Sequence, residues 1–205
     1  GSKVVIATPG ARSGVVRVGF GKDRKIKVTL TCADDGRPIS GATLVSATQI
    51  AGEEAPRGGY VQTDSAGAAV VRVDGRHSRT ISLTYRLRGG DAVAAAQARV
   101  SVRVKVPVSL RVRKLSRFTT SFRGKLSGGH VPARGVSVQL QWQDGQRWRP
   151  VATLKTSRTG VFKYRYRFSG AAAGNRYRFR AVVLPGQLDY PFVPSRSRAR
   201  SVTPG

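Results

Sequence analysis

The 205-residue sequence has little of several things on which proteins often depend. Its one cysteine, Cys32, excludes an internal disulfide and a cysteine-based zinc site, and its place in an alternating pattern predicts a small buried residue rather than a nucleophile. No stretch approaches the roughly 18 consecutive apolar residues of a membrane helix. The start, Gly1-Ser2, resembles a cloning remnant, and we expect 1–13 to be this remnant plus a lead-in segment. No charged start followed by an apolar run precedes a cleavage site, so we expect any export signal to lie outside the given sequence.

Acidic residues are scarce, whereas basic residues are abundant. The sequence contains 10 Asp and Glu and 37 Lys and Arg, which gives a net charge of +27. The excess is uneven, since residues 106–205 hold 20 bases and 2 acids, against 17 and 8 in residues 1–105. Such a field should attract polyanions such as nucleic acid, anionic lipid headgroups or phosphate-bearing wall polymers. Arg outnumbers Lys by 28 to 9, however, so a GC-rich genome is an equally good explanation of the charge.

Residue types that perform catalysis are few. The two histidines, His77 and His130, lie in predicted turns, where we expect both to be exposed. Asp74, His77 and Ser78 include the residue types of a triad, but one short hairpin cannot bring them together as separate segments do. No loop has more than two adjacent acids, too few for calcium, and no phosphate-binding loop motif is present. We therefore predict a protein that is not an enzyme, with no catalytic, cofactor-binding or metal-binding residues.

Alternation of apolar and polar residues runs through most of the chain. Segments such as KIKVTLT (25–31), RTISLTYRL (79–87) and GVSVQLQW (135–142) follow a period of two, which is typical of strands with one buried face. Gly-rich and Asp-rich turn signals separate these segments every 10 to 15 residues. Regular short strands with such turns predict an antiparallel β-sandwich.

Part of the sequence occurs twice. PISGATL at 38–44 matches PARGVSV at 132–138 at an offset of 94, and TDSAG at 63–67 matches TSRTG at 156–160 at an offset of 93. The near-constant register predicts two homologous domains of about seven strands each, over 1–105 and 106–205.

The expected join between the domains is a run of alternating residues rather than a linker. Even positions from Val100 to Val112 are apolar, and odd positions are mostly polar. We expect the last strand of the first domain to run directly into the first strand of the second, with the change at Pro107, which cannot donate to a ladder. This predicts a stiff two-domain rod.

The segments GRPISGATL (36–44), RTISLTYRL (79–87), RGVSVQLQW (134–142) and VFKYRYRF (161–168) resemble the tandem bacterial Ig-like domains of secreted or surface proteins from high-GC actinobacteria. The resemblance covers nearly the whole chain from about Gly14. It implies an all-β fold of two tandem Ig-like antiparallel β-sandwiches joined by a continuous strand with little or no linker. It also implies an extracellular or cell-surface, non-catalytic module of a longer parent chain, and it brings no functional residues with it.

The stretch KYRYRF at 163–168 alternates basic and aromatic residues. Because the period is two, the aromatic side chains should point into the sandwich and the basic ones outward, so we expect no surface on which nucleic-acid bases could stack. The predicted inward set of the second domain is Phe118, Phe122, Leu126, Val136, Val138, Leu140, Trp142, Phe162, Tyr164, Tyr166, Phe168, Tyr177, Phe179, Ala181 and Val183. The predicted polyanion contacts are Arg123, Lys125, Lys163, Arg165 and Arg167 on one sheet, and Arg176, Arg178, Arg180, Arg196, Arg198 and Arg200 on the other.

Two functions follow from these predictions. The first is a structural or adhesive module, a rigid basic two-domain spacer of an exported bacterial protein. The second is a protein that binds DNA, teichoic acid or acidic polysaccharide through its basic sheet faces, with salt-sensitive and weakly selective affinity. The expected partners are an anionic envelope polymer or other polyanion, and further domains of the parent chain. The irregular segment IAGEEAPRGGY (50–60) is the candidate for a specific contact, because loops often carry recognition.

Overall fold

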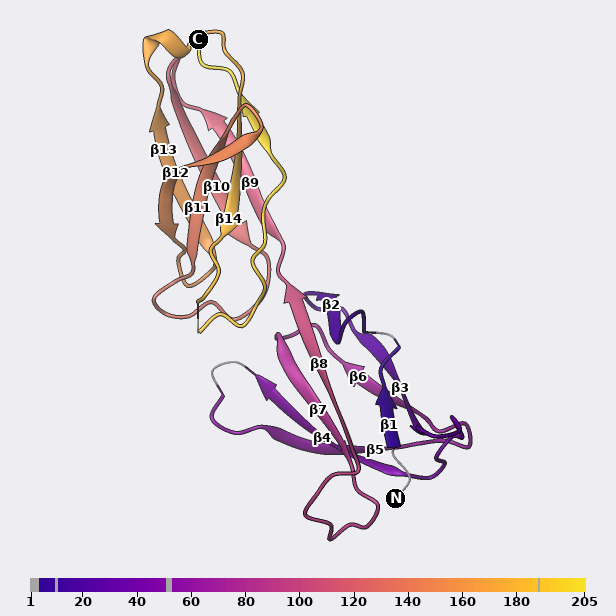
Figure 1. Ribbon diagram of the computed structural model, residues 1–205. Coiled ribbons are helices and arrows are strands. Elements are labelled where there is room, and N and C mark those ends of the chain that lie inside the picture. The colour runs from indigo at the N-terminus through magenta and orange to yellow at the C-terminus, as the bar shows by residue number, and fades with distance from the viewer. Residues whose placement is uncertain (1–3, 10, 51–52, 188) are drawn as a thin grey trace. The chain divides into compact units, whose positions relative to one another are not determined.

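The computed structural model describes residues 4–9, 11–50, 53–187 and 189–205, and the chain forms two compact units, Gly1–Val104 and Lys105–Gly205 (Figure 1). The described strands of the first unit are β1 (Val4–Ala7), β2 (Val15–Gly19), β3 (Arg24–Cys32), β4 (Thr43–Ile50), β5 (Arg57–Gln62), β6 (Ala68–Val73), β7 (Arg79–Tyr85) and β8 (Ala96–Lys105). Those of the second are β9 (Val108–Lys114), β10 (Thr119–Leu126), β11 (Ser137–Asp144), β12 (Arg147–Lys155), β13 (Val161–Arg167), β14 (Tyr177–Val183) and β15 (Arg200–Val202), with a 3-10 turn, η1 (Gly170–Ala172).

Each unit is a sandwich of two antiparallel sheets. The first unit has sheets of order β1-β3-β6 and β2-β8-β7-β4-β5, and the second has β13-β10-β9 and β12-β11-β14-β15. In both units a central strand, β3 or β10, pairs with a neighbour on each side, and β4 or β11 does the same in the other sheet. The predicted all-β fold of two tandem Ig-like sandwiches is therefore confirmed.

The alternating sequence produces the core of the second unit. Phe122 on β10 lies opposite Tyr164 on β13, and Val138 on β11 lies opposite Val183 on β14, so each apolar row faces the other sheet. The fully buried members of the predicted inward set are Phe122, Leu126, Val136, Val138, Leu140, Phe162, Phe168, Phe179, Ala181 and Val183. The half-buried members are Phe118, Trp142, Tyr164, Tyr166 and Tyr177.

The repeated motifs form the same local structure in both units. Thr63 and Thr156 are buried, and their hydroxyl oxygens accept hydrogen bonds from Ala42 N at 2.9 Å and Val136 N at 3.0 Å. Their own backbone N–H groups donate back to the carbonyl oxygens of Ala42 and Val136. The repeat at an offset of 93 to 94 thus corresponds to the same pair of reciprocal hydrogen bonds in both units, between Thr63 and Ala42 and between Thr156 and Val136. These bonds fix where β4 and β11 begin.

Replacing Thr156 with valine is expected to destabilise the second unit by about 1–3 kcal/mol, because a buried Val136 N–H loses its acceptor while the side-chain volume hardly changes. Thr156→Ser keeps the hydroxyl and should cost less. Urea unfolding of both variants provides the measurement. Equal stability of the valine and serine variants would show that the hydroxyl contributes nothing.

The alternating run across 100–112 belongs to two strands. β8 ends at Lys105 and β9 begins at Val108, so the expected continuous strand is interrupted at Val106 and Pro107. Val106 is fully buried, and Pro107 O accepts from Ser127 N at 2.9 Å. A proline has no N–H to donate, so the ladder ends where it stands, and only two residues connect the strands.

Candidate functional site

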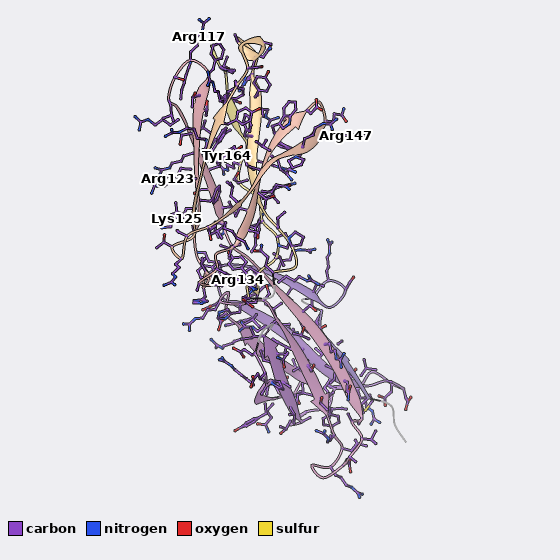
Figure 2. All side chains as sticks on the ribbon, turned by 90° about the vertical axis from the view of Figure 1, so that its left-hand side faces the viewer. Arg117, Arg123, Lys125, Arg134, Arg147 and Tyr164 are labelled. Carbon is purple, nitrogen blue, oxygen red and sulfur yellow. The ribbon has the colours of Figure 1, made fainter. Side chains whose placement is uncertain are left out.

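Seven cationic side chains project from the β13-β10-β9 sheet on the side away from the core. This set, called the basic face below, consists of Arg111 and Arg113 on β9, Arg123 and Lys125 on β10, and Lys163, Arg165 and Arg167 on β13. All seven are exposed. Figure 2 shows Arg123 and Lys125 extending from one side of the second unit. The five cations predicted for this sheet therefore do lie together on its outer surface.

The strand register arranges these charges in rows. Arg123 lies opposite Arg111 on one side and opposite Lys163 on the other, so three cations cross the sheet in line. The next row holds Arg113 and Arg165 on either side of Ser121. Strands lie about 4.8 Å apart, and rows that share a face repeat about every 7 Å. Charges at such spacing repel, and a bound polyanion would remove that repulsion.

Among the described residues of the second unit, no acid forms an ion pair with the basic face. The only acids of the second unit are Asp144 and Asp189. Asp144 is ion-paired with Arg149, and Asp189 with Arg134 at 2.8 Å. None of these four residues belongs to the basic face, so its whole charge is available to a ligand.

Arg111 and Arg113 were missing from the predicted contacts. The signal for Arg111 was present, because it occupies an outward odd position of the alternating run at 100–112. The run does not show which strand pairs with β9, however. Only the pairing of β9 with β10 brings Arg111 beside Arg123.

The other sheet does not form a second uniform basic face. Arg176, Arg178, Arg196 and Arg198 are exposed, as predicted. Arg200 is exposed as well, but it differs from Arg178 in its side of the sheet, because it lies opposite the buried Phe179. Its Nε donates to Leu110 O, on β9 of the β13-β10-β9 sheet, at 3.1 Å.

Arg180 is half-buried rather than freely exposed. Its guanidinium carbon lies 4.1 Å from the centre of the Trp148 ring, and its Nε donates to Gln141 Oε1 at 2.9 Å. Burial and the charge of Arg196 lower the pKa of Arg180 below its ordinary value. Trp148 lies opposite Gln143 on the outer side of β11, so at this place an aromatic ring and a basic group do share a surface, with the ring covered by the guanidinium.

The segment 50–60 is less irregular than predicted. β4 extends to Ile50 and its antiparallel neighbour β5 begins at Arg57, so both ends of the segment belong to paired strands. Residues 51 and 52 lie outside the described residues. Glu53 pairs with Arg57 at 2.8 Å, and Tyr60 is 80% exposed on edge strand β5.

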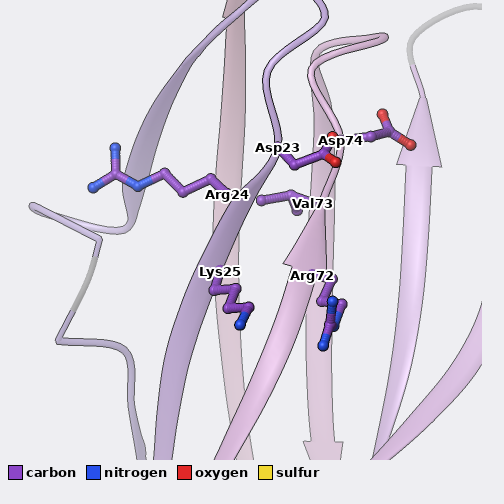
Figure 3. Close-up of a pocket in the computed structure, with 6 residues that line it drawn as sticks. All are labelled: Asp23, Arg24, Lys25, Arg72, Val73 and Asp74. Carbon is purple, nitrogen blue, oxygen red and sulfur yellow. The ribbon is translucent and has the colours of Figure 1, made fainter.

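A hollow of about 340 Å³ lies at one end of β3 and β6, lined by Asp23, Arg24, Lys25, Arg72, Val73 and Asp74 (Figure 3). Lys25 and Arg72 are paired across the two strands and extend the same way, whereas the two carboxylates lie near the strand ends. Asp74 also binds the Arg79 guanidinium at 2.8 Å, and Arg79 is only 10% exposed. The Asp74 carboxylate thus serves to hold Arg79 in place.

The same contacts separate the residues that resemble a catalytic triad. Asp74 accepts from Arg76 N and Arg79, and Ser78 Oγ accepts from Val104 N at 2.9 Å. His77 is half-buried, contrary to the exposed position predicted, while His130 is exposed. Cys32 closes β3 and is half-buried rather than fully buried.

Asp74→Asn is expected to flatten the acid limb of the stability curve of the first unit. Partial burial opposes ionisation of Asp74, but hydrogen bonds from Arg76 N and Arg79 outweigh it and hold the pKa below its ordinary 3.8. A lowered pKa contributes stability that is present above 3.8 and is lost as pH falls through the folded value. Thermal unfolding from pH 6 to pH 2 tests this, with Asp23→Asn as the control from the same hollow. An unchanged acid limb in Asp74→Asn would contradict it.

Among the residues described, no helix is long and apolar enough to cross a membrane. The described parts of the chain also contain no group of three or more His, Cys, Asp or Glu side chains gathered as a metal site.

No family model matches the sequence, and no curated protein is significantly similar to it. Among solved structures, the chain is similar to a tetra-tandem repeat from the extending region of a large adhesion protein, with 12% identity, TM-score 0.43 and coverage of 98% of this chain and 49% of that one. It is also similar to a two-domain fibronectin type III segment of chicken tenascin, with 12% identity, TM-score 0.49 and coverage of 89% and 92%. It is also similar to the chicken interferon gamma receptor alpha chain, with 10% identity, TM-score 0.45 and coverage of 88% of this chain and 92% of that one. The chain thus spans about half the length of the adhesion-protein fragment, and likenesses this low carry no argument about function.

Proposed function

We propose that this chain is a non-catalytic, two-domain β-sandwich module of an exported bacterial protein, and that its second unit attaches to an anionic polymer of the cell envelope. In this role it spaces or displays the other domains of a longer parent chain at the cell surface. The observation that carries the proposal is the basic face, where seven exposed cations occupy three adjacent strands without an acid.

The chemistry of the basic face favours a polymer over a small anion. Each row presents separate point charges in solvent, and a surface ion pair contributes at most about 1 kcal/mol. A polymer that meets several cations at once gains from each contact and releases its own counterions. No aromatic residue belongs to the basic face, since Tyr164 and Tyr166 point the other way. The attraction is therefore to charge and is weakly selective.

The experiment is a salt titration of retention on three matrices: immobilised teichoic acid, heparin and duplex DNA. Binding to the envelope polymer should persist above 0.15 M salt, where the screening length is about 8 Å. Release from every matrix below that concentration would mean that the charge is incidental and would refute the attachment. Retention by DNA alone would identify nucleic acid as the ligand and refute the envelope polymer.

A further inference from the structure

The outer side of the β12-β11-β14-β15 sheet contains a hydrogen-bonded chain that ends on an aromatic ring. Gln141 Nε2 donates to Gln139 Oε1 at 2.7 Å, and Gln141 Oε1 accepts from Arg180 Nε at 2.9 Å. The Arg180 guanidinium then lies over Trp148 at 4.1 Å. Contacts on its Nε edge and on its face fix this cation, so it is held in place before any ligand arrives.

This fixed cation has no anionic partner in the described part of the chain. The described ion pairs of the second unit join Asp144 to Arg149 and Asp189 to Arg134, and they leave Arg180 with neutral contacts only. Its terminal Nη groups have no hydrogen-bond partner among the residues that the structure describes. Burial and the neighbouring Arg196 both disfavour the charged form. An anion at the Nη edge would compensate both effects.

The free groups around Arg180 specify what could bind. A planar guanidinium edge matches a carboxylate or sulfate group, which can accept two parallel hydrogen bonds. Gln139, whose Oε1 accepts from Gln141, keeps its Nε2 donors available in the same hydrogen-bonded chain. Arg180 already covers the Trp148 ring, so a nucleic-acid base could stack on that face only by displacing a bonded side chain. Fixed guanidinium and amide groups side by side suit an anionic sugar that also carries hydroxyls.

We propose that Arg180, Trp148, Gln141 and Gln139 form a subsite for one carboxylate or sulfate group of an acidic polysaccharide. The subsite uses a different sheet from the basic face and goes beyond the attachment proposed above. It adds a defined contact to a surface that otherwise recognises only charge. It survives if the basic face turns out to bind nothing.

Trp148 provides the readout. In a Trp142→Phe background Trp148 is the only tryptophan left. An anion that binds the Arg180 guanidinium should change the fluorescence of Trp148, because the guanidinium lies over its ring. The probes are a hyaluronan hexasaccharide, which carries carboxylates, a heparin hexasaccharide, which also carries sulfates, and a thymidine hexanucleotide. We expect a saturable change with at least one saccharide and none with dextran. Response to the saccharides identifies which oxyanion is preferred. No saccharide response, or an equal response to the oligonucleotide, would overturn the proposal.

Gln141→Glu places a carboxylate where the amide now accepts from Arg180, so the subsite supplies its own anion. We expect saccharide affinity to fall at least tenfold while thermal stability is kept or raised, which separates loss of binding from loss of folding. Arg158→Gln, in an exposed turn that belongs to neither surface, makes the same change in net charge and should leave the Trp148 response within twofold. Arg180→Lys keeps the charge but loses the planar fork of donors and should weaken binding about fivefold. Equal affinities of Gln141→Glu and Arg158→Gln would overturn the assignment.

Discussion

Gly124→Ala is expected to destabilise the second unit by about 3 kcal/mol. Gly124 on β10 lies directly opposite Phe162 on β13, and both are buried. A Cβ added at Gly124 would lie 2.0 Å from the Phe162 ring. The ring has little space to move, because Phe122, Leu126 and Leu140 are fully buried in the same core. Overpacking of this kind typically costs 1–3 kcal/mol, and a contact this short belongs at the upper end.

The measurement is urea unfolding, and two further variants make it specific. Gly170→Ala adds the same methyl group where nothing lies within 4 Å, so it should change stability by less than about 0.5 kcal/mol. Adding Phe162→Leu to Gly124→Ala removes the ring edge and should recover part of the loss. If Gly124→Ala and Gly170→Ala unfold at the same urea concentration, the ring does not require the glycine.

Most of the fold could be predicted because one physical signal dominates it. In KYRYRF the period of two separates Tyr164 and Tyr166 from Lys163, Arg165 and Arg167, and the register of β13 against β10 confirms the separation. Tyr166 packs against Phe168 at 4.8 Å between ring centres, as an inward residue should. The two tyrosines are only half-buried, however. An alternating pattern predicts on which side of the sheet a side chain lies, whereas the extent of its burial depends on the residues that pack around it.

The failures occurred where an irregular strand broke the period. Arg196 and Arg200 are both even-numbered, yet Arg196 lies opposite Val182 and Arg200 opposite the buried Phe179. Between them the ladder is irregular, because Ala181 N donates to the Ser197 hydroxyl and Ser197 N donates back to Ala181 O. A register change of this kind transfers side chains to the other face. No composition or turn signal marked it.

The Arg180 subsite was hidden for a related reason. Gln141 and Trp148 are seven residues apart, and both contact Arg180 because of the β11–β12 hairpin, which has a register shift between Leu140 and Gln141. A shift of one residue decides which side of β12 faces solvent. Of the two tryptophans, the period of two placed Trp142 on the core side, whereas only the register of β12 against β11 assigns Trp148 to the surface.

A triple substitution in the basic face tests whether position or total charge attracts the polymer. Arg111, Arg123 and Lys163 form one row across three strands, and changing all three to glutamine lowers the net charge from +27 to +24. For duplex DNA as a reference polyanion, each lost phosphate contact reduces the slope of log K against log salt by about 0.9. The slope should therefore fall by about 2 to 3, and affinity by about 100-fold at 0.1 M salt, with little difference near 1 M.

The matched control removes three cations from the first unit. Lys25, Lys27 and Arg72 are exposed on β3 and β6, and changing them to glutamine gives the same net charge of +24. If the basic face is the contact, the control should keep most of the salt slope, because a cation that touches no phosphate releases few counterions. Equal losses in the two variants would mean that the polymer responds to the charge of the whole chain. The rows on β9, β10 and β13 would then have no special part in binding, and the attachment proposed for them would fail.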